Sequence, residues 1–268
     1  MRTIGHVAVN VFRESVRDKV LYNLVAFAVL LIAVSFLVGQ LTAGQDVKII
    51  KDLGLAAIAT FGLLIAVFIG IGLVWKEVER RSIYSLLSKP IQRYQFILGK
   101  YAGLALTLFI NVAVMTVAFY AVLAFVNTQF PDSVRATWPA PATDPRMLLA
   151  IGLIFVELLL VTAIALFFST FSSPFLSVAL TLGFWVIGHF NNDLRNFEAV
   201  VESPAAAYVA RGLYYLLPNF AAFDVKTQVV YALPVPMSYV ATTVAYGFVY
   251  TALLLVGAVA VFSRRDFK

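Results

Sequence analysis

Six long runs of apolar residues constrain this chain more than any other feature of its sequence. Each run is rich in Leu, Val, Ile, Ala and Phe, and about 20 such residues span a bilayer as a helix. Lipid offers the backbone no hydrogen-bond partners, so each run must be helical. We predict an all-α polytopic membrane protein. The predicted spans are Val20–Leu41, Leu53–Trp75, Tyr101–Val126, Met147–Thr170, Pro174–Phe190 and Met237–Phe262.

The composition supports a membrane rather than an aqueous environment. Hydrophobic residues make up 62% of the chain and charged residues 13%, against about 25% charged in soluble domains. The spans leave no room for a large soluble domain. The chain has no cysteine, which excludes disulfides, thiolate metal sites and cysteine nucleophiles.

Basic residues predict the orientation, because Lys and Arg concentrate in cytoplasmic segments. With the N-terminus inside, thirteen of the 20 basic residues lie inside and seven outside. The net charge of +6 is therefore a topology signal and not a nucleic-acid patch. The inner set is Arg2, Arg13, Arg17, Lys19, Lys76, Arg80, Arg81, Lys89, Arg93, Lys100, Arg264, Arg265 and Lys268. The outer set is Lys48, Lys51, Arg135, Arg146, Arg195, Arg211 and Lys226.

Two segments outside the spans have a distinctive pattern. Residues Thr3–Lys19 place apolar side chains at helical spacing, which predicts an amphipathic helix at the membrane surface; the alternative is a plain extension of the first span. The stretch Asn191–Pro236 is rich in Tyr, Phe and Pro. Its prolines predict short helices that lie on the outer leaflet or dip into it; the alternative is an ordinary loop.

Residues for catalysis are sparse in this sequence. The two histidines, His6 and His189, fall on opposite sides in the predicted topology, and His189 is expected at the interface. The pair Gly99-Lys100 does not belong to a phosphate-binding loop of the form GxxxxGK[ST]. Tyr94 stands where the first glycine is required, and Tyr101 stands where Ser or Thr is required. Glu157 is the one acidic residue within a span, and a functional and a structural role both remain open for it. The other polar residues that we singled out, expected to pack or bond between helices, are Gln40, Asn111 and Thr162.

The segment Lys76–Lys100 joins the second and third spans and is the most informative part of the chain. Glu77–Ser88 is predicted to be a helix with an apolar stripe and exposed charges. Pro90 ends this helix, and Ile91–Gly99 starts a second one that leads into the third span. A short, charged helix between two membrane helices suits a docking element for a cytoplasmic partner.

This segment resembles the signature region of type-2 permeases of ATP-binding-cassette (ABC) transporters. The sequence departs from the family pattern at Arg81-Ser82, where Gly-Thr is more frequent. The resemblance extends over the whole chain, including Leu217–Phe220 and Arg264–Phe267, and is greatest to the group that contains the nitrous-oxide-reductase maturation permease. The matching residues are Glu79, Ser82, Leu86, Leu87, Ser88, Pro90, Arg93, Gly99 and Lys100.

The resemblance implies one transmembrane permease domain over residues 1–268, in the bacterial inner membrane with both termini cytoplasmic. It implies no enzymatic activity, no metal and no cofactor in this chain, because a partner ATPase would bind ATP and magnesium. The other implied partners are a second permease copy or paralogue, membrane lipid and a periplasmic accessory protein, and nucleic acid is not among them. The implied coupling residues are Glu77, Glu79, Arg80, Arg81, Ser82, Leu86, Leu87, Pro90 and Arg93.

We therefore predict the permease subunit of an ATP-driven exporter. One alternative is a membrane anchor or assembly factor that docks a soluble partner without transport. Another is a membrane-embedded enzyme, which would require Glu157, His189 and Asn191 to converge in one cavity. The sequence leaves the substrate open, although spans without charged linings favour a lipidic or amphipathic one.

Overall fold

The structure is a computed structural model that describes residues 2–41, 46–79, 92–191 and 204–264. All regular secondary structure in these ranges is helical, which confirms the all-α polytopic fold class. The helices are α1 (Arg2–Ser15), α2 (Lys19–Gln40), α3 (Asp46–Glu79), α5 (Arg93–Gln129), α6 (Asp132–Arg135), α7 (Arg146–Ser169), α8 (Pro174–His189), α10 (Pro204–Leu216), the 3₁₀ helix η2 (Phe220–Phe223), α11 (Lys226–Val230) and α12 (Met237–Arg264).

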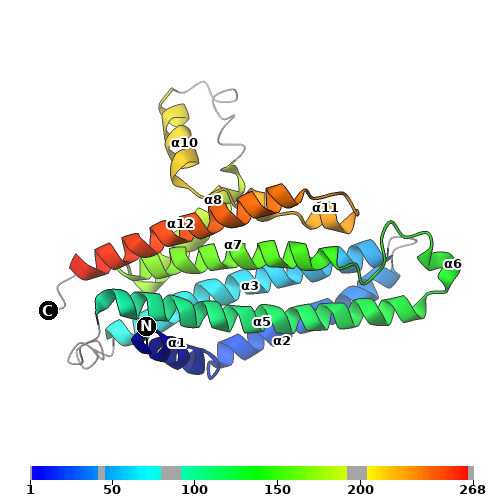
Figure 1. The fold of residues 1–268 in the computed structure, drawn as a ribbon, viewed down its shortest axis with the longest axis horizontal. Helices are drawn as coiled ribbons and strands as arrows, with labels where there is room; N and C mark the ends of the chain where they lie inside the picture. The colour runs from blue at the N-terminus through cyan, green and yellow to red at the C-terminus, as the bar shows by residue number, and fades with distance from the viewer. Residues whose placement is uncertain (1, 42–45, 80–91, 192–203, 265–268) are drawn as a thin grey trace.

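Five long helices lie side by side and form an elongated bundle (Figure 1). In the described part of the chain, α2, α3, α5, α7 and α12 are long and apolar enough to cross a membrane. Helix α7 is the most buried of these five helices, and it packs against α3, α5, α8 and α12. The first and last described residues lie toward one end of the bundle, which we call the terminal end, and α6 and α11 lie at the other, which we call the far end.

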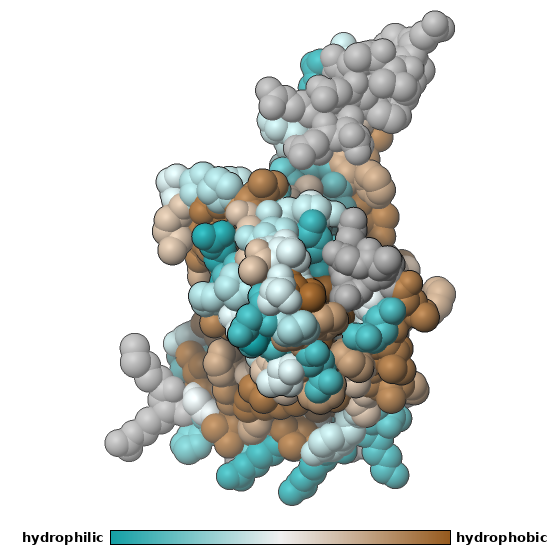
Figure 2. All heavy atoms as spheres, turned by 90° about the vertical axis from the view of Figure 1, so that its right-hand side faces the viewer, coloured by the Kyte–Doolittle hydropathy of each residue, from teal (hydrophilic) through white to brown (hydrophobic). Residues whose placement is uncertain are grey.

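The distribution of polar residues agrees with a membrane setting. Figure 2 looks onto the far end, where hydrophilic residues gather in the middle of the view and hydrophobic residues cover much of the flanks. Many large apolar side chains, such as Phe27, Val117 and Leu253, are more than half exposed. Lipid can cover such side chains at no cost in free energy, whereas water cannot.

Two helices extend well beyond the spans predicted from hydrophobicity. Helix α3 begins at Asp46, so Lys51 lies within a helix and not in a loop. Lys51 is buried at 2% exposure, and its Nζ donates a hydrogen bond to the Pro141 carbonyl at 2.8 Å. Helix α5 begins at Arg93 and continues without interruption into the predicted third span. Hydrophobicity detects the apolar core of a helix, whereas backbone hydrogen bonding can carry the helix further into polar sequence.

The fifth apolar helix, α8, is too short to span a membrane on its own. Its 16 residues rise about 24 Å, against a hydrocarbon layer of about 30 Å. Residues 217–230, which we call the re-entrant segment, follow α10 and pack against α3, α7 and α8. Phe220 and Phe223 in this segment are fully buried. An ordinary surface loop is therefore the wrong description of the segment, although α10 itself stands away from the long helices (Figure 1).

The N-terminal helix α1 packs on the beginning of α5. It is separate from α2, which starts after Asp18, whose Oδ1 accepts a hydrogen bond from the Val20 amide at 2.9 Å. The alternative of a plain extension of the first span is therefore wrong. The contact with α5 passes over Gly99 and Gly103, which are spaced as in the GxxxG pattern of close helix pairs. A Cβ at Gly103 would lie 2.6 Å from the Ala8 carbonyl oxygen.

The close approach of α1 to α5 leads to a prediction about Gly103. Replacing Gly103 by Ala adds one methyl group against the α1 backbone, which cannot yield as a flexible side chain can. We expect the Gly103→Ala variant to lose about 1–3 kcal/mol of unfolding free energy. The measurement is an unfolding titration of the purified protein in mixed detergent micelles.

Gly152 provides the matched control for this substitution. It lies in helix α7, and a Cβ there would meet nothing within 4 Å. The Gly152→Ala variant should be neutral or more stable by up to about 1 kcal/mol, because Ala favours a helix more than Gly does. Equal destabilisation of both variants would contradict the tight α1–α5 contact.

Candidate functional site

The beginning of α5 is fastened to the end of α12 at the terminal end of the bundle. The Arg93 guanidinium donates hydrogen bonds from Nη1 to the carbonyls of Phe262, at 3.3 Å, and Ser263. The rings of Phe96 and Phe262 stack with centroids 5.7 Å apart. The last carbonyls of a helix have no partner within it, so a cation is favourable at this position. Arg93 therefore couples two helices that are far apart in the sequence.

Helix α1 and Lys100 complete this arrangement. Lys100 is buried at 1% exposure, and its Nζ lies 4.9 Å from the centroid of the Phe96 ring. Such a cation–π contact stabilises more strongly where water is excluded. On another face of α5, α1 packs closely against Gly99 and Gly103. We call this meeting of α1, the first turns of α5 and the end of α12 the terminal junction.

Most of the predicted coupling residues cannot be placed against this junction. Glu77 and Glu79 belong to the last turns of α3, which the structure describes by its backbone alone. Arg93 is the one coupling residue whose side-chain contacts are described, and they connect α5 to α12. The predicted coupling residues outside the described ranges are Arg80, Arg81, Ser82, Leu86, Leu87 and Pro90.

Glu157 connects α7 to α8 near the middle of the bundle. Its side chain is buried, and its Oε1 accepts a hydrogen bond from the indole Nε1 of Trp185 at 2.8 Å. His189 Nε2 lies 3.7 Å from the same oxygen, beyond hydrogen-bond distance. The His189 ring stacks on Phe220 of the re-entrant segment with centroids 5.7 Å apart. His189 therefore belongs to an internal cluster, although its side chain keeps 27% exposure.

Sequence analysis missed Trp185 as the partner of Glu157. A signal was present, because an indole N–H within an apolar helix needs an acceptor. Of the other polar residues of the spans, Asn111 and Thr162 are buried and pack in the interior as predicted, but they do not bond between helices. Asn111 donates to the Thr107 carbonyl at 2.6 Å and Thr162 to the Leu158 carbonyl at 2.8 Å, both within their own helices. Gln40, at the end of α2, is exposed.

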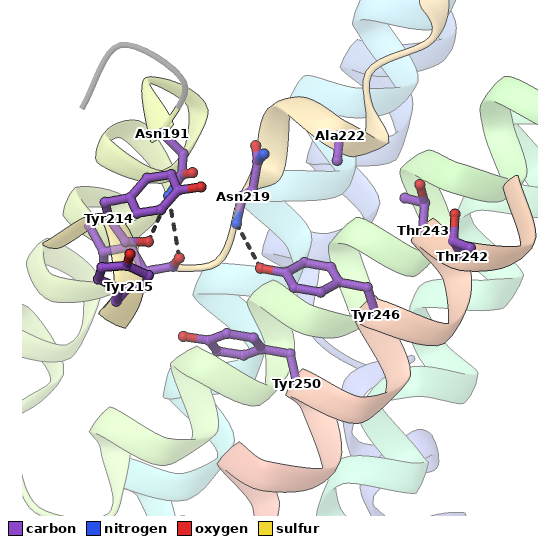
Figure 3. A pocket seen from close by; sticks show the side chains of 10 residues that line it. Asn191, Tyr214, Tyr215, Asn219, Ala222, Thr242, Thr243, Tyr246 and Tyr250 are labelled. Carbon is purple, nitrogen blue, oxygen red and sulfur yellow. Dashed lines mark hydrogen bonds between the residues drawn. The ribbon is translucent and has the colours of Figure 1, made fainter. Parts of the chain in front are cut away.

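A pocket lies between the end of α10, the start of the re-entrant segment and the half of α12 nearer the far end. Its volume is about 510 Å³, within the range of small-molecule sites. Figure 3 shows the rings of Tyr246 and Tyr250 from α12 opposite those of Tyr214 and Tyr215 from α10. None of the lining residues carries a formal charge at neutral pH. They are Asn191, Tyr214, Tyr215, Leu217, Asn219, Ala222, Thr242, Thr243, Tyr246 and Tyr250.

Hydrogen bonds from α12 hold the irregular backbone of the pocket wall. The Tyr246 hydroxyl accepts from the Asn219 amide at 2.9 Å, and the Tyr250 hydroxyl donates to the Leu216 carbonyl. Tyr239, just outside the pocket, donates to the Ala222 carbonyl at 2.7 Å. Spaced seven and four residues apart, these three tyrosines fall on one side of α12. The spacing of the three tyrosines is visible in the sequence, but the backbone groups that their hydroxyls bond are not.

The enzyme hypothesis required Glu157, His189 and Asn191 to converge in one cavity. Asn191 lines the pocket and donates from Nδ2 to the Tyr214 carbonyl at 3.2 Å. Glu157 and His189 lie close together, but neither of them lines this pocket. Within the described ranges, no three His, Cys, Asp or Glu residues are grouped as metal ligands would be. The required convergence is therefore not found.

The bond between Trp185 and Glu157 leads to a prediction about helix packing. Removing the donor with Trp185→Phe should lower the unfolding free energy by about 1 kcal/mol, a typical value for a bond between membrane helices. Glu157→Gln should have little effect, since an amide oxygen also accepts the indole proton. The measurement is a double-mutant cycle of Trp185→Phe with Glu157→Leu, in which the unfolding free energy of each variant is determined in mixed micelles.

Trp138 serves as the control for this cycle. It lies between α6 and α7, and its ring packs edge to face against the Phe130 ring, with the ring centroids 5.7 Å apart. Combining Trp138→Phe with Glu157→Leu should give additive effects. Additive effects in the Trp185 cycle as well would show that the bond contributes nothing.

Comparison with known families agrees with this architecture. The family described as ABC-2 family transporter protein matches residues 6–267, which is nearly the whole chain. A search of curated proteins finds no match. The family match and the apolar helices together show that the chain belongs to the ABC-2 transporter family and is a multi-pass membrane permease of an ABC transporter.

Proposed function

We propose that the chain is the permease subunit of an ATP-driven exporter whose motor is a separate cytoplasmic ABC ATPase. In this proposal the ATPase binds ATP and magnesium and docks at the terminal end of the bundle. The contact is the end of α3, with Glu79, and the segment that joins α3 to α5, with Leu86. The family match supports an ATPase partner, and the resemblance described above supports the docking segment.

The observation that carries the proposal is the terminal junction. The docking segment leads directly into α5, whose first turns contact α1 through Gly99 and Gly103 and the end of α12 through Arg93. A displacement of the segment would therefore act on three helices together. Helix α5 has 37 residues and α12 has 28, so both extend from the junction toward the far end. Continuous helices of this length transmit displacement with little internal deformation.

The distribution of charge supports the placement of the partner. The segments assigned to the terminal end hold thirteen of the 20 basic residues, which favours a cytoplasmic position in a bacterial inner membrane. The resemblance to type-2 permeases supports export rather than import. A second permease copy or a paralogue would complete the path, and a periplasmic accessory protein would bind at the far end. A link to the nitrous-oxide-reductase group remains a prediction.

Arg93 provides a test of mechanical coupling. Replacing Arg93 by Ala removes the bonds to the last carbonyls of α12 and changes no residue between α3 and α5. We expect the ATPase still to bind, but transport per ATP hydrolysed to fall about ten-fold, equivalent to 1.4 kcal/mol of lost coupling. The measurement compares ATP hydrolysis with transport in proteoliposomes that contain the assembled transporter.

Arg13→Ala is the control for this variant, because Arg13 is exposed on α1 and its loss should leave coupling unchanged. Transport and hydrolysis that remain coupled in Arg93→Ala would remove the terminal junction from the mechanism.

The docking segment has its own test. Leu86→Asp places a charge on the apolar stripe, and Glu79→Ala removes a charge beside it. We expect either change to abolish ATPase recruitment or to uncouple hydrolysis from transport, with membrane insertion unchanged. The measurement is co-purification of the ATPase with the tagged permease, followed by ATPase assays in liposomes.

The same experiment separates transport from anchoring. A chain that recruits no ABC ATPase, and stimulates none in liposomes, would be an anchor or assembly factor instead. Normal recruitment and transport by both variants would move the docking site elsewhere on the terminal end.

A further inference from the structure

We infer that the pocket between α10, the re-entrant segment and α12 binds an amphiphile with an uncharged, hydroxyl-rich headgroup, such as a glycosylated lipid. The binding itself is independent of the proposed function. That the bound amphiphile is the cargo of the exporter rests on that function.

The lining of the pocket selects an uncharged ligand. None of its ten residues is a Lys, Arg, His, Asp or Glu. A phosphate group placed there would lose part of its hydration without gaining an opposite charge, which disfavours it. A neutral headgroup avoids this cost.

The polar groups of the pocket suit a ligand with several hydroxyls. Tyrosine and threonine hydroxyls and asparagine carboxamides can each donate and accept hydrogen bonds. The Tyr246 hydroxyl oxygen accepts a hydrogen bond from the backbone N–H of Asn219, which leaves the hydroxyl proton available for a ligand. The Oδ1 atom of Asn219 is buried with no hydrogen-bond partner among the described residues. A rotation of this carboxamide toward the pocket would let a ligand hydroxyl satisfy it and offset the cost of leaving it unpaired.

Paired tyrosine rings form the walls on both sides. Tyr246 and Tyr250 have ring centroids 5.9 Å apart, and Tyr214 and Tyr215 have centroids 5.1 Å apart. Tyrosine combines an apolar ring with a polar tip, so it can cover the C–H face of a sugar ring and bond its hydroxyls. The volume of about 510 Å³ holds a headgroup of one or two such rings.

An exposed apolar stripe on α12 supplies a place for the acyl chains. Val249, Leu253 and Val256 follow Tyr246 at helical spacing and are all more than 60% exposed. The stripe from Tyr246 to Val256 is about 15 Å long at 1.5 Å per residue. It leads from the pocket toward the terminal end. A free sugar would leave this stripe unused, whereas a lipid would occupy the pocket and the stripe together.

Photolabelling of the purified permease tests the binding. Three probes carry the same acyl chains and the same diazirine near the glycerol: a glucosyl diacylglycerol, a phosphatidylcholine and a phosphatidylglycerol. The glucosyl probe should label peptides from residues 208–222 and 239–250 about ten-fold more than either phospholipid. Equal labelling by all three would show a surface that lipids cover without selection, and would overturn the inference.

Two variants and their controls locate the bound headgroup. Ala222→Phe fills the pocket, and Thr243→Val removes a hydroxyl from it with little change of shape. Both should lose the selective labelling. Ala245→Phe and Thr251→Val are the controls, because these residues are on α12 but do not line the pocket. Thermal unfolding verifies that each variant is folded, and undiminished labelling of folded Ala222→Phe and Thr243→Val would contradict the assignment.

A second permease copy is the alternative occupant of the stripe. The chain has no cysteine, so Val249→Cys introduces a single thiol. Lipid on the stripe predicts no disulfide between copies at this position. Efficient oxidation to a disulfide-linked dimer, with loss of selective labelling, would assign the face to a protein contact and overturn the inference.

Measurements on the assembled transporter then distinguish cargo from a resident lipid. As cargo, the glucosyl lipid should stimulate ATP hydrolysis several-fold, and Ala222→Phe should abolish this stimulation, whereas the control Ala245→Phe should retain it. Selective labelling without stimulation would overturn the cargo role alone. Failure of ATPase recruitment would refute the proposed function and leave the binding result intact.

Discussion

The structure depends on one constraint, which is that lipid provides no hydrogen-bond partners for the peptide backbone. Long helices satisfy their own backbone groups, and the polar side chains of the spans follow the same rule. Thr107 and Thr162 return their hydroxyls to carbonyls of their own helices, and Asn111 does the same with its amide. These residues therefore cost little in the apolar interior without connecting one helix to another.

The re-entrant segment is the place where this rule needs help from side chains. Its backbone leaves the helical conformation between α10 and η2, and the helical turns that follow pack against α3, α7 and α8. Tyrosines of α12 and the carboxamide of Asn191 bond the exposed groups, among them the Leu217 carbonyl at 3.5 Å and the Asn219 amide. Irregular backbone at membrane depth is tolerated only where protein supplies such partners. The same tyrosines that stabilise the segment also form the wall of the pocket, so structure and ligand binding share one set of hydroxyls.

Helix α12 joins the two regions to which we assign functions. Near its end, the carbonyls of Phe262 and Ser263 accept hydrogen bonds from the guanidinium of Arg93 at the terminal junction. Nearer its beginning, Tyr246 and Tyr250 hold the pocket wall. A shift of α5 at the junction would therefore reach the pocket through a single helix. The hydrogen bond from Trp185 to Glu157 connects α8 to α7, so the buried carboxyl group of Glu157 has a structural partner.

The sequence by itself determined the helical class and the apolar helices, because hydrophobic length is a local property of the chain, and its resemblance to type-2 permeases identified the family. Hydrophobicity also marked the apolar α8, and the prolines marked α10, which starts at Pro204 and ends two residues before Pro218. Tertiary structure alone decided how distant residues pair. Arg93 meets Phe262 across 169 positions, and Trp185 meets Glu157 across 28. Such contacts depend on how the helices pack and rotate about their axes, and no local pattern specifies that. The pocket likewise arises only when the re-entrant segment folds back onto α12, where the hydroxyls of one helix meet the free backbone groups of another segment.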